Sequence, residues 1–402
     1  MRIKNALAAS ALCAALAAAT GGCNGNGKPA PNQATEQARK HWASARANVL
    51  ANLAKEQYDN GNFDKSRQTI EEALRMDPDN VPLRILSARL AIEQSNLELA
   101  DKELVLARRL DPRSGEADYL SGVVCQRWQR APEAYDYYRS AGEKVPTEPA
   151  YVLAQAETLV VLNRPDEALA LLQSKVVYFE YSATIRDAVG QLLMQKGRYD
   201  QAVEFLRQAS VLATDDATIR EHLALAHFRN KQYRDAADVL ARLLKDDRYA
   251  KRADLHLALG ECYMNADRHR EARDTFQTAS QLNPNQASVW MGLGKAALQL
   301  NDLRRADLAL RRSISIEPAN GEANLLLGYV RLRQGKLDDA LAAFRKASAL
   351  APDDTVSLCM VGYVLDKQGQ GADALRAYAQ ALKIKPGDDM ATRLMADVQL
   401  HQ

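Results

Sequence analysis

One short stretch of the sequence is similar to a phosphate-binding loop. It reads Gly292-Leu293-Gly294-Lys295 and would hold phosphate through backbone amides and the lysine. A loop of that kind also has an earlier glycine and a serine or threonine directly after the lysine, and the sequence has neither. We therefore expect the chain to bind no nucleotide.

Histidine and cysteine are the other residues that could form a reactive or metal-binding site. His222 and His227 are five positions apart, whereas two metal ligands on one helix face are four apart. Cys125, Cys262 and Cys359 lie in apolar stretches, where a small buried thiol is the ordinary role. The many charged residues recur with the helical period, as on solvated helix faces. We predict no metal, no cofactor and no enzymatic activity.

Cys23 has a different setting, because it follows an export signal. Residues 1–22 begin with Arg2 and Lys4, continue as a run rich in alanine and leucine, and end in small residues. That order is typical of a secretory signal peptide. The apolar run is too short to cross a membrane as a helix. Residues 1–22 are therefore predicted to be removed on export.

The small residues before Cys23 also resemble the lipobox of bacterial lipoproteins. The resemblance implies that the Cys23 thiol takes a diacylglyceryl group and that the new amine is acylated after cleavage, and two or more chains anchor a protein stably. Thr20 departs from that family, which usually has leucine there, so ordinary cleavage stays open. Residues 23–34 would be the lipidated cysteine and a flexible tether. We predict an exported lipoprotein of the bacterial cell envelope, on the periplasmic face of an outer membrane if the cell has one.

The charge balance gives no electrostatic reason to expect a nucleic-acid partner. The chain holds 53 Lys and Arg residues against 51 Asp and Glu residues, and two of the basic residues lie in the signal. The exported chain is therefore neutral in formal charge. Proteins that bind nucleic acids carry a basic excess instead.

A period of 34 residues organises the rest of the chain and is clearest in Ala287–Pro318. A period of this length is typical of an antiparallel helix pair that buries its apolar face only against its neighbours. We expect an all-α solenoid of ten repeats over residues 35–388 and a capping helix over residues 389–402. The repeats start at residues 47, 81, 115, 149, 183, 217, 253, 287, 321 and 355.

Several positions of the repeat have a fixed character. The eighth residue is always glycine or alanine and the twentieth is nearly always alanine, which predicts that the two helices cross closely there. The twenty-fourth residue is always bulky, as in Ile70 and Tyr378, and is predicted to fill the space between repeats. The fifteenth is glycine, asparagine or aspartate in seven repeats, which tolerate the left-handed backbone of a helix end.

This pattern resembles the tetratricopeptide repeat (TPR). The residues that carry the resemblance in one repeat are Trp290, Leu293, Gly294, Ala306, Leu310 and Pro318. The resemblance implies a right-handed α-solenoid of about ten helix pairs whose first helices line a concave groove. In repeats four to six the closing proline is missing and the tryptophan position holds Val152, Arg186 and Arg220, so we expect bending or flexing there. The run Tyr178-Phe179-Glu180-Tyr181 at one junction either fills a loose contact or touches a partner.

Positions 2, 5, 9 and 12 of each repeat form a stripe along the first helix, here named the first-helix stripe, which the TPR resemblance places in the groove. In repeats five to seven it is acidic, with Asp187, Gln191, Glu221, Asp254 and Glu261. In repeats eight to ten, with the neighbouring thirteenth position, it is apolar, aromatic and basic. We predict that this part is the partner-binding groove, made of Met291, Lys295, Leu325, Tyr329, Arg333, Tyr363 and Lys367. Alternatively, Tyr329 and Tyr363 only pack against each other.

We consider three functions: an interaction scaffold, a glycan-binding module and an enzyme whose active site lies within the repeats. Similarity to TPR lipoproteins implies a protein–protein interaction scaffold that holds a partner polypeptide while an envelope machine is assembled, such as a pilus, a secretion system or a polysaccharide exporter. The alternative is a module that binds envelope glycan or peptidoglycan, or regulates a cell-wall enzyme in trans. Mixed apolar and charged groove positions favour a protein or peptide partner. The membrane would be contacted through the lipid anchor.

Overall fold

The computed structural model describes residues 33–400, so Cys23 and the predicted signal lie outside the described part. Within residues 33–400 every regular element is an α-helix, which confirms the predicted all-α class. None of these helices is both long enough and apolar enough to span a lipid bilayer. The chain divides into two compact units, and the boundary between them in the sequence falls between Leu120 and Ser121, inside helix α5 (Gly115–Arg127).

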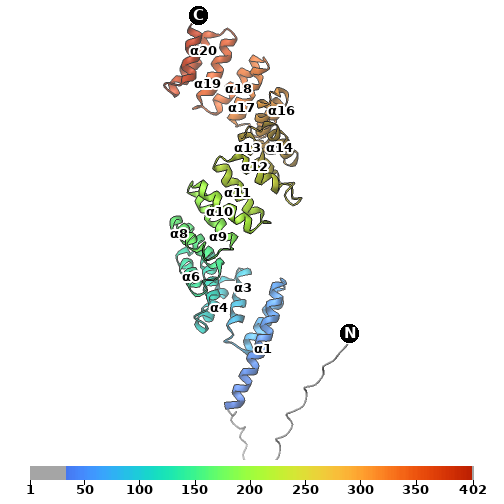
Figure 1. The fold of residues 1–402 in the computed structure, drawn as a ribbon, viewed down its shortest axis with the longest axis vertical. Coiled ribbons are helices and arrows are strands. Elements are labelled where there is room, and N and C mark those ends of the chain that lie inside the picture. Colours follow the sequence, from blue (N-terminus) through green and yellow to red (C-terminus); the bar gives the residue numbers. More distant parts are fainter. Residues whose placement is uncertain (1–32, 401–402) are drawn as a thin grey trace, which may run out of the picture. The chain divides into compact units, whose positions relative to one another are not determined.

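Unit 1 contains two helix pairs and the start of α5. Its helices are α1 (Gln33–Asp59), α2 (Phe63–Met76), α3 (Val81–Glu93) and α4 (Leu97–Leu110). Helix α1, drawn in blue in Figure 1, runs for 27 residues without a break, so the extension from Thr35 continues into the first repeat. The core of this unit joins Ala47 and Ala54 of α1 to Ile70 and Leu83.

Unit 2 continues the same alternation of first and second helices. Its further helices are α6 (Ala131–Lys144), α7 (Pro149–Val161), α8 (Pro165–Lys175), α9 (Ala183–Gln195), α10 (Tyr199–Leu212), α11 (Ala217–Arg229), α12 (Tyr233–Leu243), α13 (Ala253–Asn265), α14 (His269–Leu282), α15 (Ala287–Gln299), α16 (Leu303–Ile316), α17 (Gly321–Arg333), α18 (Leu337–Leu350), α19 (Thr355–Lys367), α20 (Gly371–Ile384) and α21 (Asp389–Leu400). Helix α21 packs against α19 and α20.

The two helices of each pair are joined by a turn with one residue in the left-handed region. The positive φ angles at the fifteenth repeat position belong to Gly61, Ser95, Gln129, Asn163, Gly197, Lys231, Asp267, Asn301, Gly335 and Gly369. Glycine adopts this conformation without strain, whereas Gln129 and Lys231 adopt it at a cost. The turn is therefore imposed by the packing of the pair even where the residue type does not favour it.

Phe276 shows how neighbouring repeats pack. Its ring is almost fully buried, with 1% exposed, and lies between a glycine of its own repeat and a glycine of the next. A Cβ atom on Gly260 would lie 2.5 Å from Cε1 of this ring, and one on Gly292 would lie 2.6 Å from the same atom. The small residue and the bulky residue are thus two halves of one contact, which extends into the following repeat.

The fourth position, where one repeat has tryptophan, has a polar role. In four repeats its side-chain nitrogen lies within hydrogen-bond distance of a carbonyl six or seven residues earlier, in the turn that precedes the helix. These pairs are Arg84 with Pro78 (2.8 Å), Arg186 with Phe179 (3.0 Å), His256 with Ala250 (2.9 Å) and Trp290 with Pro284 (2.9 Å). Arginine, histidine and tryptophan are alike here because each offers an N–H group. We expected Arg186 to weaken the repeat pattern because it replaces tryptophan. It instead makes the same kind of hydrogen bond to the preceding turn as Trp290 does.

Repeats four and six differ in the length of the second helix. Helices α8 and α12 have 11 residues, whereas α10, α14, α16, α18 and α20 have 14. Each short helix ends before a position that lacks the closing proline, held by Glu180 and by Arg248. In these two repeats the departure is thus a second helix that ends early and a longer turn, whereas repeat five, with Thr214 at that position, keeps a second helix of 14 residues.

Candidate functional site

Three hollows lie along the first-helix stripe. One in unit 1 has a volume of about 430 Å³ and lies between α1 and α3. Two in unit 2 have volumes of about 210 Å³, between α7 and α9, and about 440 Å³, between α11 and α13. Residues at positions 5, 9 and 12 of the repeats line all three hollows. The first helices therefore form similar hollows in separate parts of the chain.

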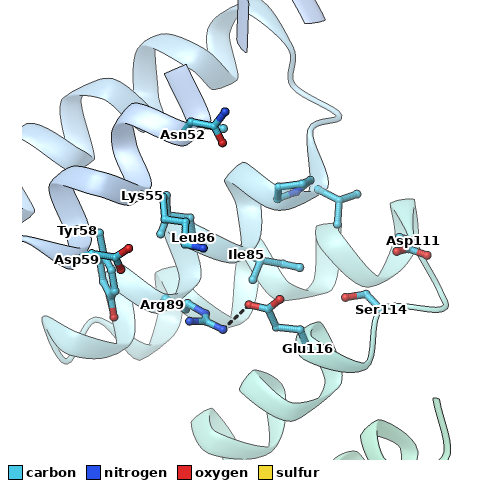
Figure 2. A pocket seen from close by; sticks show the side chains of 13 residues that line it. Asn52, Lys55, Tyr58, Asp59, Ile85, Leu86, Arg89, Asp111, Ser114 and Glu116 are labelled. Atoms are coloured by element: carbon cyan, nitrogen blue, oxygen red, sulfur yellow. Dashed lines mark ion pairs between the residues drawn. The ribbon is translucent and has the colours of Figure 1, made fainter. Parts of the chain in front are cut away.

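The hollow in unit 1 combines apolar and charged side chains, as Figure 2 shows. Ile85 forms part of its apolar wall, and Lys55 brings a cation to the rim. Arg89 also lies at the rim, and its guanidinium is 2.6 Å from the carboxylate of Glu116. The Tyr58 pKa is raised, chiefly by burial, so the phenol stays neutral and can donate a hydrogen bond. Sequence reasoning did not single out these repeats.

The hollow between α11 and α13 has an apolar floor and an acidic edge. Leu225 and Phe228 line it with Glu221, Asp254 and Glu261. Arg252 lies beside the edge, 2.6 Å from Glu221, and also forms an ion pair with Asp254.

Glu261, the third carboxylate at this edge, forms no ion pair with Arg252, and its pKa is raised. Burial raises the Glu261 pKa, and nearby Lys295 opposes that shift. Three members of the predicted acidic stretch, Glu221, Asp254 and Glu261, therefore line one cavity, where arginine neutralises part of their charge. Gln191 instead lines the hollow between α7 and α9, and Asp187 pairs with His222.

The seven residues predicted as the partner-binding groove lie on three first helices, α15, α17 and α19. Lys295 is 2.6 Å from the carboxylate of Glu322 on the next first helix. The Lys367 ammonium lies over the Tyr363 ring, 5.5 Å from its centroid. The cations of this surface are thus already engaged within the chain, and a partner would have to share or replace these contacts.

The apolar members of the predicted groove are tied to the core. Leu325, Tyr329 and Tyr363 all pack against the buried cluster around Phe344, and the Tyr329 ring meets Phe344 edge-on with centroids 5.3 Å apart. Met291 is half-buried. Arg333 reaches back to the turn of the previous repeat, where its guanidinium donates to Asn301 at 3.1 Å. Tyr329 therefore supports its own repeat as well as presenting an edge to the surface.

The aromatic run at the end of repeat four is divided between the core and the surface. Phe179 is buried, with 8% exposed, and belongs to the core cluster of repeats four and five. Tyr178 and Tyr181 point outwards, with 58% and 82% exposed. Only the phenylalanine fills the junction, and the two tyrosines remain at the surface.

The glycines and the cysteine that the sequence analysis considered for chemistry lie in packed positions of first helices. Gly292 and Gly294 lie inside α15, where their amides serve the helix and their faces receive Phe276 and Leu310. Burial raises the pKa of the Cys262 thiol to about 12, so the thiolate is scarce. Among residues 33–400 no three His, Cys, Asp or Glu side chains are arranged to hold a metal ion.

Comparison with known families identifies the repeat. Residues 52–107 and 186–220 match the tetratricopeptide repeat, and residues 212–402 match the family described as cilia and flagella-associated protein 70 C-terminal domain. The chain therefore contains tetratricopeptide repeats, as the sequence pattern predicted. No protein with a curated description matches it in sequence.

Solved structures of repeat proteins are similar over parts of the chain. MamA (residue 41 to the end) from Desulfovibrio magneticus RS-1 is 18% identical, with a TM-score of 0.41, over 44% of this chain and 98% of that one. YrrB, described as a TPR protein with an unusual peptide-binding site, is 18% identical, with a TM-score of 0.35, over 55% and 96%. The APC/C hetero-tetramer Cut9–Hcn1 is 15% identical, with a TM-score of 0.44, over 88% and 76%.

Proposed function

We propose that this TPR chain is a protein–protein interaction scaffold that binds a segment of a partner polypeptide along the first-helix stripe. The observation that carries the proposal is the recurrence of hollows with mixed apolar and charged linings at the same repeat positions. A polypeptide places apolar anchors and charged groups at intervals along its length, so seats repeated along a row of helices suit it.

The proposal includes anchorage to the bacterial cell envelope. It is supported by the signal-like residues 1–22 and by the two glycines before Cys23. A lipid on Cys23 would hold the repeats at the membrane surface, where the scaffold would serve assembly of an envelope machine. A pilus, a secretion system and a polysaccharide exporter are the machines that fit this class of protein.

Site-specific photo-crosslinking in the native cell tests the proposed surface. A photoreactive residue in place of Leu225 stands at the hollow between α11 and α13, where the leucine is 42% exposed. The control replaces Leu308 on the second helix α16, which is 54% exposed. We expect a covalent adduct with a polypeptide from Leu225 and none from Leu308. Adducts of equal yield at both positions, or a carbohydrate adduct at Leu225, would contradict the proposal.

A further inference from the structure

Helix α1 has two apolar faces, and its own unit covers only one of them. The inner face carries Ala47 and Ala54, both with 0% exposed, which belong to the core cluster of unit 1. The outer face carries Trp42, Val49 and Leu53, with 76%, 68% and 43% exposed. A helix that is apolar on both sides is normally covered on both sides.

The outer face has the spacing of a helix-packing seam. Ala38, Trp42, Ala45 and Val49 follow one another at steps of four, three and four residues, and all four are exposed. Steps of this kind keep side chains on the line along which a second helix packs. Alternation of large and small residues gives knobs and holes, so a partner helix can approach closely at Ala38 and Ala45.

The residues that flank this seam are basic. No Asp or Glu occurs between Gln37 and Lys55. Arg39 and Arg46 lie on one side of the seam and His41 on the other, as the helical spacing of 3.6 residues per turn requires. Arg46 approaches Glu72 of α2 at 3.6 Å, while Arg39 and His41 form no ion pair within residues 33–400. The surface around the seam thus complements negative charge.

We propose that the outer face of α1 is the docking site for an amphipathic helix of a partner protein, whose apolar seam is flanked by Asp and Glu. Apolar spacing supplies the packing, and opposite charges at the flanking positions select the partner and its orientation. This site lies on the side of α1 away from the core of unit 1, and it stands whether or not the first-helix stripe binds a polypeptide.

Two other occupants fit the observations less well. In a second copy, the antiparallel register that sets Trp42 against Ala45 also brings Arg39 of one chain near Arg46 of the other, and like charges oppose that pairing. A membrane surface is bound in proportion to the apolar area buried, and half of this four-residue seam is alanine. An acidic helix satisfies both the packing and the charge.

The test uses the full-length protein and two synthetic helical peptides of roughly four heptads with the same leucine and alanine seam. One peptide carries Glu at the flanking positions and the other carries Lys. Binding is followed by calorimetry and by tryptophan emission, in which Trp128 and Trp290 give a constant background and burial of the Trp42 indole gives a shift to shorter wavelength. We expect the Glu peptide to bind at least about tenfold more tightly than the Lys peptide, with binding that weakens as salt is added.

Three variants separate the proposed contact from general effects. Val49→Asp is expected to weaken the Glu peptide by about tenfold or more, whereas Leu308→Asp on α16 is expected to leave it unchanged. The double change Arg39→Glu with Arg46→Glu is expected to reverse the preference in favour of the Lys peptide. A reversed preference is a gain of binding and cannot come from misfolding.

Four results would overturn the proposal. The first is that neither peptide binds saturably, and the second is that both bind equally. The third is a dimer in sedimentation that Val49→Asp dissociates, which would assign the face to a second copy. The fourth is binding to vesicles of phosphatidylglycerol and phosphatidylethanolamine that requires Trp42 while neither peptide binds, which would assign the face to a membrane.

Discussion

A Cβ atom on Gly294 would lie 2.7 Å from Cγ of Leu310, the bulky residue that faces it across repeat eight. Leu310 is fully buried, so it has little room to move away. We expect Gly294→Leu to force the two helices apart and to cost about 1–3 kcal/mol by overpacking. Hydrogen exchange should show fraying centred on repeat eight, because each repeat touches only its neighbours.

Gly142 provides the matched control for this prediction. It also lies in a helix, α6, but nothing lies within 4 Å of the Cβ that it lacks. Gly142→Ala is expected to be neutral or to stabilise by roughly 0.5–1 kcal/mol. Uniform loss of protection across all repeats in Gly294→Leu would contradict the local packing that we describe.

Arg186 is expected to be worth more to stability than a surface arginine. Its guanidinium donates to the carbonyls of Phe179 and Ser182 at 3.0 and 3.2 Å, and the residue is buried. Arg186→Ala leaves two carbonyls without this donor and should cost about 1–3 kcal/mol. Chemical unfolding, with hydrogen exchange of repeats four and five, measures the loss.

The same repeat position supplies the control. The Nε atom of Arg220 is 3.5 Å from the carbonyl of Asp216, which is too long for a strong hydrogen bond. Arg220→Ala should therefore change stability by less than about 0.5 kcal/mol. If both alanine variants lose the same stability, the donor at the fourth position has no special role. Arg186→Trp should keep part of the stability, since the indole also donates an N–H group.

These residues mark how far the sequence could predict the fold. The 34-residue spacing of small and bulky residues predicts where helices pair. Only small residues fit where two helices cross, and bulky residues fill the space between repeats. The left-handed turns at Ser95, Gln129 and Lys231 could not be read from residue type, since each residue is held there by the packing around it. The hydrogen bond from Arg186 to the preceding turn could not be predicted either. Arginine and tryptophan differ as residue types, although both side chains donate an N–H group.

The candidate site was less predictable than the fold. The sequence spacing correctly placed Lys295 and Tyr329 on the first helices of neighbouring repeats. It could not show that the Tyr329 ring contacts Phe344 or that Lys295 pairs with Glu322. Nor did it indicate the hollow around Arg89 in unit 1. Cavities depend on how far neighbouring helices stand apart, and no single residue encodes that distance.

The pair of His222 and Asp187 should make stability depend on pH. The Nδ1 atom of His222 lies 2.8 Å from Oδ1 of Asp187, on the preceding first helix. This hydrogen bond raises the His222 pKa, burial opposes it, and Glu221 and Asp216 add smaller favourable charges. A raised pKa means that the folded state holds the proton more tightly than the unfolded state does.

The stabilisation is therefore complete below the unfolded pKa of about 6.5 and is lost as pH rises through the raised folded pKa. Thermal unfolding between about pH 6 and 8 should show this decline. His222→Gln should flatten it, and Asp187→Asn should bring the imidazole titration, followed by NMR, back towards its ordinary range. A His222 titration that Asp187→Asn leaves unmoved would show that the pair does not set the pKa.

Membrane attachment should depend on Cys23. We expect Cys23→Ser to release the protein from the membrane or to leave an unprocessed precursor, since the serine hydroxyl cannot take the thioether-linked lipid. Metabolic labelling with a fatty acid checks this expectation. Cys13→Ser is the control, because Cys13 follows the bulky Leu12 rather than small residues. Unlabelled native protein, or full labelling of Cys23→Ser, would refute the lipid anchor.

The C-terminal part of the first-helix stripe can be tested by a double change. Tyr329→Ala with Lys295→Ala removes an aromatic edge and a cation from neighbouring first helices, and Tyr is frequent among residues that dominate binding energy. We expect a partner segment identified by crosslinking to bind at least about tenfold more weakly, which corresponds to about 1.4 kcal/mol. Calorimetry with the purified segment measures the loss.

Stability needs its own control here, because the Tyr329 ring packs against Phe344 and its truncation also disturbs the core. Phe344→Leu disturbs the same contact from the buried side, where 0% of Phe344 is exposed, and removes nothing from the surface. If Phe344→Leu weakens the partner as much as the double change does, the loss comes from unfolding. If binding survives the double change, the partner does not bind at these helices. The hollow between α11 and α13 is then the next site to test, with the variant Leu225→Asp.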